Sequence, residues 1–129
     1  MAVRRILVDS GALSALADGH EALRIVARKA IKDDISIVVP TIVIAESTIG
    51  DARDANVNRT LSQLDVIDLS EGIARDAARL RARVRGSEVA DAVMLATADR
   101  ISGTTVITGD PRDLRALAAV ANRTTVVEF

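Results

Sequence analysis

Short apolar segments rich in β-branched residues alternate along this chain with longer segments of helical periodicity. The strand-like segments cover residues 6–8, 35–39, 66–69, 105–108 and 124–127. Strands that alternate with helices favour a parallel sheet with helices on both faces. We therefore expect one α/β domain spanning residues 1–129, a three-layer α/β/α sandwich with a central parallel sheet of four to five strands.

Apolar residues at helical spacing and capping residues predict where the helices lie. The predicted helices cover residues 12–17, 21–31, 56–64, 89–101 and 112–120, with two more between Thr41 and Gly50 and between Ser70 and Gly86. Ser70 is expected to cap its helix. Asp99, two turns after Asp91, is expected to be solvated.

Composition excludes several kinds of site. The 129 residues include no cysteine and one histidine, His20, so disulfides, zinc–thiolate sites and histidine-rich metal sites are excluded. No run approaches the ~20 apolar residues of a membrane span, and no signal peptide is evident, so we expect a cytoplasmic protein. Phe129 is the only residue among Phe, Tyr and Trp, which nearly excludes base stacking. A nucleic acid would have to be held by arginine, backbone amides or a metal.

Four acidic residues interrupt or directly follow apolar segments: Asp9, Glu46, Asp91 and Asp110. Asp9 and Asp110 follow two predicted strands, at the sheet edge where ligands bind in parallel α/β folds. Three of the acids also have ordinary explanations, Asp9 as a turn or capping residue, Asp91 as a first-turn helix acid and Asp110 as a turn residue. Glu46 fits a solvated surface less well, because its helix is apolar on nearly every side.

Carboxylates set against hydrocarbon cost folding energy unless a positive charge compensates them. A divalent metal held by oxygen ligands is the simplest compensation, and Mg²⁺ prefers such ligands. The chemistry that needs such a cluster is metal-assisted phosphodiester hydrolysis, because the metal polarises a phosphoryl oxygen and activates a bound water. The number of ions stays open, and Mn²⁺ is an alternative to Mg²⁺.

The segments around these acids resemble the four acidic motifs of PIN-domain nucleases. They are residues 7–13 (LVDSGAL), 39–46 (VPTIVIAE), 91–98 (DAVMLATA) and 106–114 (VITGDPRDL). No single motif is specific, but all four occur in the family's order and at roughly its spacing. Within the family, the chain most resembles the VapC toxins of bacterial toxin–antitoxin pairs.

The resemblance implies a PIN-like fold and a Mg²⁺-dependent endoribonuclease that acts as a toxin. Asp9 and Asp91 would bind the ion most directly, and Glu46 and Asp110 would complete the pocket. Thr108 matches the hydroxyl before the fourth acid and would help to place water or metal. The family further implies an RNA substrate, a homodimer and a small antitoxin protein that blocks the acidic pocket.

For three residues near the motifs, the sequence leaves two interpretations open. Asp113 fits an acid often found shortly after the fourth motif acid, or it caps the following helix. Glu88, one turn before Asp91, either points into the same pocket or is a first-turn helix acid. Arg112 either contacts an RNA phosphate or pairs with a carboxylate of the site, whereas the arginines between Arg75 and Arg85 fit a solvated helix face.

Three other functions compete with the toxin. An aspartyl-phosphate receiver or phosphatase would share the layered fold but needs a lysine after a later strand, and the chain has only Lys29 and Lys32. Its phosphatase form also needs a second aspartate where Gly11 stands. A non-catalytic binding module would not need all four acids. A PIN-type RNA-processing nuclease without an antitoxin is not separated from a toxin by the sequence.

Overall fold

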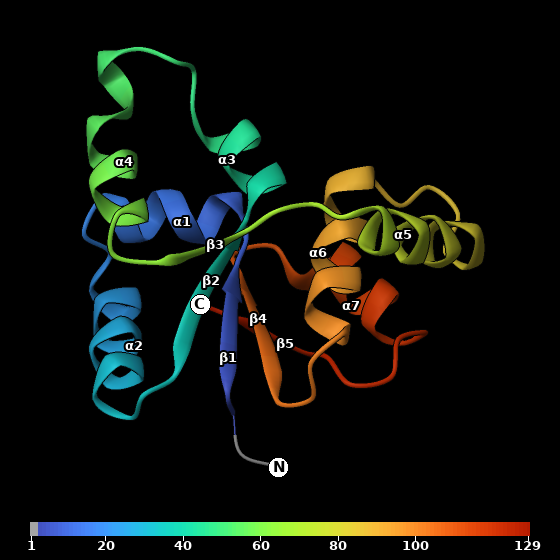
Figure 1. Cartoon of the computed structure of the whole chain (residues 1–129). Helices are drawn as coiled ribbons and strands as arrows, with labels where there is room; N and C mark the ends of the chain where they lie inside the picture. Colours follow the sequence, from blue (N-terminus) through green and yellow to red (C-terminus); the bar gives the residue numbers. More distant parts are fainter. Residues whose placement is uncertain (1–2) are drawn as a thin grey trace.

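Five short strands form one all-parallel sheet in the computed structural model, which describes residues 3–129 (Figure 1). The strands are β1 (Arg5–Val8), β2 (Ser36–Pro40), β3 (Asp65–Ile67), β4 (Thr104–Thr108) and β5 (Thr125–Glu128). They pair in the order β3-β2-β1-β4-β5. Leu7 at the centre pairs with Val38 and Val106, and all three side chains are buried, as expected for strands covered on both faces. Met1 and Ala2, which the predicted domain includes, lie outside the described residues.

The helices that connect these strands form two layers. They are α1 (Ser10–Ala17), α2 (Glu21–Lys32), α3 (Thr41–Ser47), the 3₁₀ turn η1 (Ala52–Asp54), α4 (Ala55–Leu61), α5 (Glu71–Arg83), α6 (Val89–Asp99) and α7 (Pro111–Ala118). In Figure 1, α1, α2 and α4 cover one face of the sheet and α5, α6 and α7 cover the other, while α3 stands near the carboxyl ends of the strands. The predicted three-layer α/β/α sandwich is thereby confirmed.

The helices change face between β1 and β4 because the strand order reverses there. The chain moves from β1 outward through β2 to β3, then returns across the sheet to β4 and continues to β5. With right-handed connections, this reversal puts the later helices on the opposite face. The segments that follow β1 and β4 therefore turn into different layers, and ligands of parallel α/β folds bind beyond the carboxyl ends of the strands at such a point.

Helix α6 is the most deeply buried helix of the described chain. Every residue from Ala92 to Ala98 is buried, because α6 lies between the sheet and α5. Ile73 and Ala77 of α5 pack against α6 and leave the opposite face of α5 to solvent. No helix within residues 3–129 combines the length and the apolar content needed to span a membrane.

The predicted elements are present, but several end at other residues. The Ser70 hydroxyl caps α5 as predicted, accepting a hydrogen bond from the Ile73 N–H at 3.1 Å. Thr41 is the first residue of α3, and its hydroxyl accepts a hydrogen bond from the Leu69 N–H at 3.3 Å. Leu69 was predicted to be a strand residue, but its N–H makes this bond and β3 ends at Ile67.

Candidate active site at the carboxyl edge of the sheet

Asp9 follows β1 directly and is the N-cap of α1. Its backbone is extended, and its Oδ1 accepts a hydrogen bond from the Ala12 N–H at 2.8 Å. The predicted capping role is therefore confirmed. Within residues 3–129 the other carboxylate oxygen of Asp9 has no hydrogen-bond donor, so it is available to a ligand. The cap thus holds a half-buried carboxylate at the carboxyl edge of the sheet.

Asp91 lies in the first turn of α6 and carries the most perturbed carboxyl group of this region. Burial, as the largest cause, and the charges of four other acids together raise the pKa of Asp91 to about 6; the acids are Asp113, Glu88, Glu46 and Asp9, in decreasing order. No hydrogen bond to the Asp91 carboxyl is present within the described chain. A half-buried acid without donors, surrounded by like charges, is a site that favours a proton or a cation.

Glu46 reaches this group from the end of α3. The residue is largely exposed, yet partial burial raises the pKa of its carboxyl, and the charges of Asp9 and Glu88 raise it further. Glu88, the residue before α6, acts on both Glu46 and Asp91. Glu88 therefore lies near the acidic group, as the first of its two predicted roles requires, and it makes no side-chain cap of α6.

The two acids of the last motif, Asp110 and Asp113, differ in their effect on Asp91. Asp113, in the first turn of α7, is the charge that acts most strongly on Asp91. Asp110 is exposed at the N-cap of α7, makes no side-chain capping bond and is not among the charges that shift Asp91 or Glu46. The fold thus brings together Asp9, Glu46 and Asp91 of the predicted set, with Glu88 and Asp113, and leaves Asp110 at the rim.

Thr108 and Arg112 lie two residues before and two residues after Asp110 in the last motif. The Thr108 side chain is fully buried, and its hydroxyl accepts a hydrogen bond from the Asp110 N–H at 3.0 Å. The Phe129 N–H donates to the Thr108 carbonyl at 3.1 Å, which fixes this turn against the C-terminal residue. Arg112 is exposed in the first turn of α7 and has no ion pair within residues 3–129. Its charge is therefore free to meet a ligand at the site.

The donor set of this group fits a hard divalent cation. The candidate ligands are carboxylate oxygens alone, which Mg²⁺ and Mn²⁺ accept. Burial and neighbouring acids raise the pKa values of Asp91 and Glu46, and neither carboxyl forms an ion pair in the described part of the chain. Within residues 3–129, however, no three acidic or histidine side chains already stand as a metal site. A cation would have to draw the carboxylates closer together.

The chain belongs to the PIN-domain family, whose model matches residues 6–120. No curated protein sequence matches it. Among solved structures, the fold is similar to VapBC2 from Rickettsia felis bound to a promoter DNA fragment, with a TM-score of 0.78 and 14% identity over 97% of this chain and 98% of that one. It is also similar to DNA-bound VapBC from Salmonella typhimurium (TM-score 0.69, 18% identity, 99% and 98% covered). A toxin–antitoxin complex from Klebsiella pneumoniae is similar at a TM-score of 0.63 and 25% identity, with 84% and 88% covered.

Proposed function

We propose that this protein is a metal-dependent endoribonuclease that acts as the toxin of a toxin–antitoxin pair. The observation that carries the proposal is the convergence of Asp9, Glu46, Glu88 and Asp113 on one half-buried carboxylate, Asp91, in a chain of the PIN-domain family. Repulsion within this group has no protein partner to offset it. A divalent cation with a phosphate ligand would offset it.

We propose that Asp9 and Asp91 hold a Mg²⁺ ion most directly, with Mn²⁺ as a substitute. Glu46 and Asp110 are proposed to complete the pocket, and the proximity of Asp113 to Asp91 supports adding Asp113 to that set. When bound, the ion supplies positive charge to the phosphate oxygens and lowers the pKa of a water molecule. The carboxylates orient that water by accepting its hydrogen bonds, and Arg112 pairs with a phosphate oxygen.

The proposed reaction is hydrolysis of an RNA phosphodiester bond. The water oxygen forms a bond to phosphorus, and the bond from phosphorus to one ribose oxygen breaks. The departing ribose oxygen gains a proton, and the acids of the site accept the proton that the water loses. Thr108 is proposed as a positioning residue, because its buried hydroxyl holds the backbone of Asp110.

The proposed partners are a small cognate antitoxin and a second copy of the chain, in the cytoplasm. Similar folds occur in chains of toxin–antitoxin complexes, which supports an antitoxin that covers the acidic pocket. An arginine from such a protein would be the simplest group to neutralise the carboxylates.

Induced expression tests the toxin proposal. We expect the unmodified chain to arrest growth and to cleave RNA in a reaction that EDTA abolishes, whereas Asp9→Asn and Asp91→Asn do neither. Asp33→Asn, an exposed acid after α2, is the matched control and should behave as the unmodified chain. Equal toxicity of all four proteins would refute the catalytic role of the acids.

A further inference from the structure

A cavity lies at the far end of α6 from Asp91. It has a volume of about 480 Å³ and is bounded by α5, the end of α6 and the segment between α7 and β5. Four arginines line it: Arg79, Arg83, Arg100 and Arg123. Arg100 follows Asp91 by nine positions, which corresponds to about 14 Å along a helix axis. The cavity is therefore separate from the acidic site but in the same helical layer.

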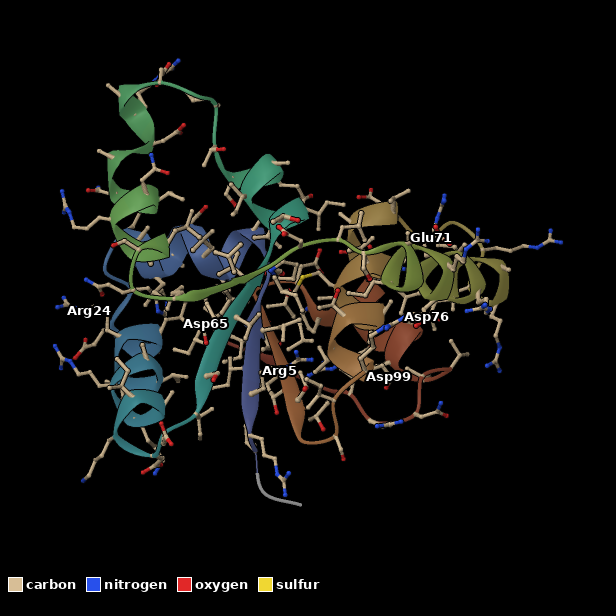
Figure 2. The ribbon with its side chains drawn as sticks, in the orientation of Figure 1. Arg5, Arg24, Asp65, Glu71, Asp76 and Asp99 are labelled. Atoms are coloured by element: carbon tan, nitrogen blue, oxygen red, sulfur yellow. The ribbon has the colours of Figure 1, made fainter. Side chains whose placement is uncertain are left out.

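Two aspartates in this cavity are already engaged by the protein. Asp76 of α5 accepts hydrogen bonds from Arg79 at 2.6 Å and from Arg100 at 2.8 Å. Asp99 accepts hydrogen bonds from the backbone N–H groups of Asn122 and Arg123, the latter at 2.6 Å. Figure 2 shows Asp76 and Asp99 on the neighbouring helices α5 and α6. These bonds fix the walls of the cavity.

Two of the four arginines, Arg83 and Arg123, are available to pair with an anion. Within residues 3–129 neither Arg83 nor Arg123 forms an ion pair, and Arg83 donates only to the Val120 carbonyl, at 3.2 Å. Arg79 and Arg100 share the single charge of Asp76. The cavity therefore has an excess of positive charge, which attracts an anion.

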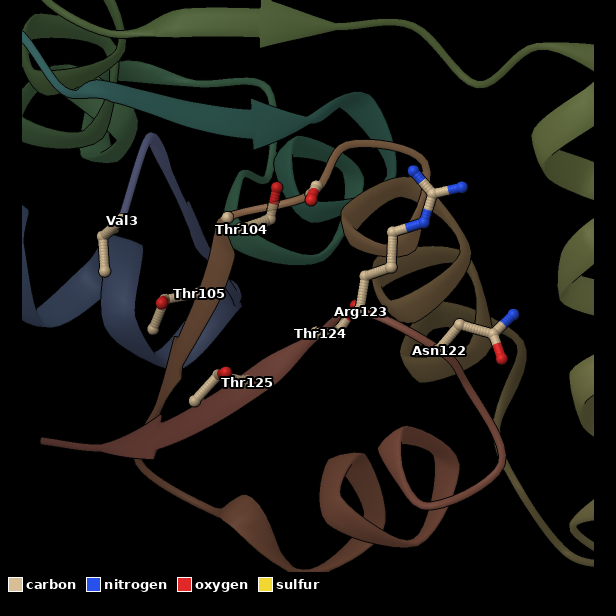
Figure 3. A pocket seen from close by; sticks show the side chains of 9 residues that line it. Val3, Thr104, Thr105, Asn122, Arg123, Thr124 and Thr125 are labelled. Atoms are coloured by element: carbon tan, nitrogen blue, oxygen red, sulfur yellow. The ribbon is translucent and has the colours of Figure 1, made fainter. Parts of the chain in front are cut away.

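Arg123 also borders a second hollow, shown in Figure 3, with a volume of about 360 Å³. Threonines from the beginnings of β4 and β5 line this hollow, among them Thr105 and Thr125. Their hydroxyl groups can donate to phosphate oxygens or bond ribose hydroxyls. The two cavities meet at Asn122 and Arg123, so the positive wall continues into a wall of hydroxyl groups.

We infer that this arginine-lined cavity binds the sugar–phosphate backbone of single-stranded RNA, a few nucleotides away from the bond cut at the acidic site. The inference rests on the proposed function, which makes RNA the substrate. The positive wall formed by Arg83 and Arg123 continues into the threonine-lined hollow, so the surface extends farther than one free phosphate ion would need. With no Trp or Tyr to stack on bases, recognition here uses charge and hydroxyl groups.

The test compares two double variants that lose the same charge. Arg83→Gln with Arg123→Gln removes both unpaired cavity arginines, whereas Arg24→Gln with Arg28→Gln removes two exposed arginines of α2, on the other face of the sheet. Both are made in an Asp91→Asn background, so that RNA is bound without being cut. Binding of a fluorescent, unstructured 12-nucleotide RNA is measured by anisotropy at several salt concentrations.

We expect the cavity variant to bind RNA about tenfold more weakly at 0.1 M salt. The slope of log K against log salt should become shallower by about 1.4, the loss of two single-strand phosphate contacts. The α2 variant should match its parent. In proteins that retain Asp91, the cavity variant should raise KM and leave kcat nearly unchanged.

Three results would overturn the inference. Unchanged affinity and salt slope in the cavity variant would show that the cavity does not bind RNA. The proposed function could still hold if RNA cleavage were metal-dependent. Displacement of RNA by polyglutamate at equal charge concentration would assign the cavity to an acidic protein segment instead. If the parent neither binds nor cleaves RNA, the proposed function fails, and the inference fails with it.

Discussion

Asp91 of α6 and Asp113 of α7 approach one another across the carboxyl edge of the sheet. After burial itself, Asp113 is the strongest of the influences that raise the pKa of Asp91 to about 6. The two helices pack side by side on one face of the sheet, and each carries an acid in its first turn, at the carboxyl edge of the sheet. Such an arrangement costs stability in the metal-free protein and provides oxygen ligands for a cation.

Replacement of Asp91 by Asn should stabilise the metal-free protein above about pH 6. The pKa of Asp91 is raised in the folded state, so the folded protein binds this proton more tightly than the unfolded chain does. Its stability therefore falls as the pH rises from about 4 to about 6 and stays lower above that range. Because the carboxyl is half-exposed, we expect Asp91→Asn to gain only about 1 kcal/mol, or roughly 3 °C in Tm.

Thermal unfolding in EDTA at pH 8 and at pH 5 measures this effect. The gain should be smaller at pH 5, where part of the unmodified protein is already protonated at Asp91. Asp33→Asn, an exposed acid, should change Tm little at either pH. Identical melting of Asp91→Asn and the unmodified protein at pH 8 would show that the repulsion is absent.

Mg²⁺ should raise the Tm of the unmodified protein at pH 7.5, and EDTA should reverse the rise. At a free concentration ten times the dissociation constant, the gain is about 1.4 kcal/mol. The gain should shrink at pH 5, because burial and neighbouring acids give Asp91 a pKa of about 6 and a proton then competes with the ion. Asp91→Asn should lose most of the effect; an undiminished rise in that variant would place the ion elsewhere.

The layered fold could be predicted because its signals are local. Each strand is a short β-branched segment, and each helix has its own periodicity, so both survive without tertiary information. The end of α3 could not be predicted in the same way. Asp54 is buried and accepts bonds from the N–H groups of Ile49 and Gly50, which takes the chain out of the helix at Ser47.

The acidic group could be predicted only in part. That Asp9 and Asp110 follow strands at one edge results from topology alone. Which acid of the last motif faces Asp91 depends on the rotation of α7 about its axis, and here Asp113 faces it. Asp99 was expected to be solvated; it is partly exposed, but its carboxylate also accepts hydrogen bonds from a segment more than twenty residues later in the chain. No local sequence pattern predicts such a contact.

Asp113→Asn should reduce RNA cleavage more than Asp110→Asn does. Both acids are exposed, but only Asp113 is among the charges that raise the pKa of Asp91. We expect a loss of about a hundredfold in kcat/KM for Asp113→Asn, a size typical of a positioned acid or base, and a smaller loss for Asp110→Asn. Single-turnover cleavage at saturating Mg²⁺ separates the two. A larger loss for Asp110→Asn than for Asp113→Asn would indicate that Asp110 is the more important acid of the site.

Arg112→Ala should weaken RNA cleavage chiefly through substrate binding. Its guanidinium has no ion pair within the described residues and is one position from Asp113, so it can pair with a phosphate at the site. We expect KM to rise about tenfold, with a smaller change in kcat. Arg28→Ala on α2 is the control, and equal kinetics of the two variants would remove Arg112 from the site.

Asp99→Ala should destabilise the fold by about 2 kcal/mol, the cost of leaving several donors without their charged acceptor. Asp99 accepts hydrogen bonds from the N–H groups of Asn122 and Arg123 and from the Thr124 hydroxyl, so its loss releases the segment that leads into β5. Urea unfolding measures the change, with Asp68→Ala, an exposed residue, as the control. Because the same segment carries Arg123, RNA binding should also weaken under conditions where Asp99→Ala is still folded. A variant as stable as Asp68→Ala would mean that these hydrogen bonds are replaced by water without cost.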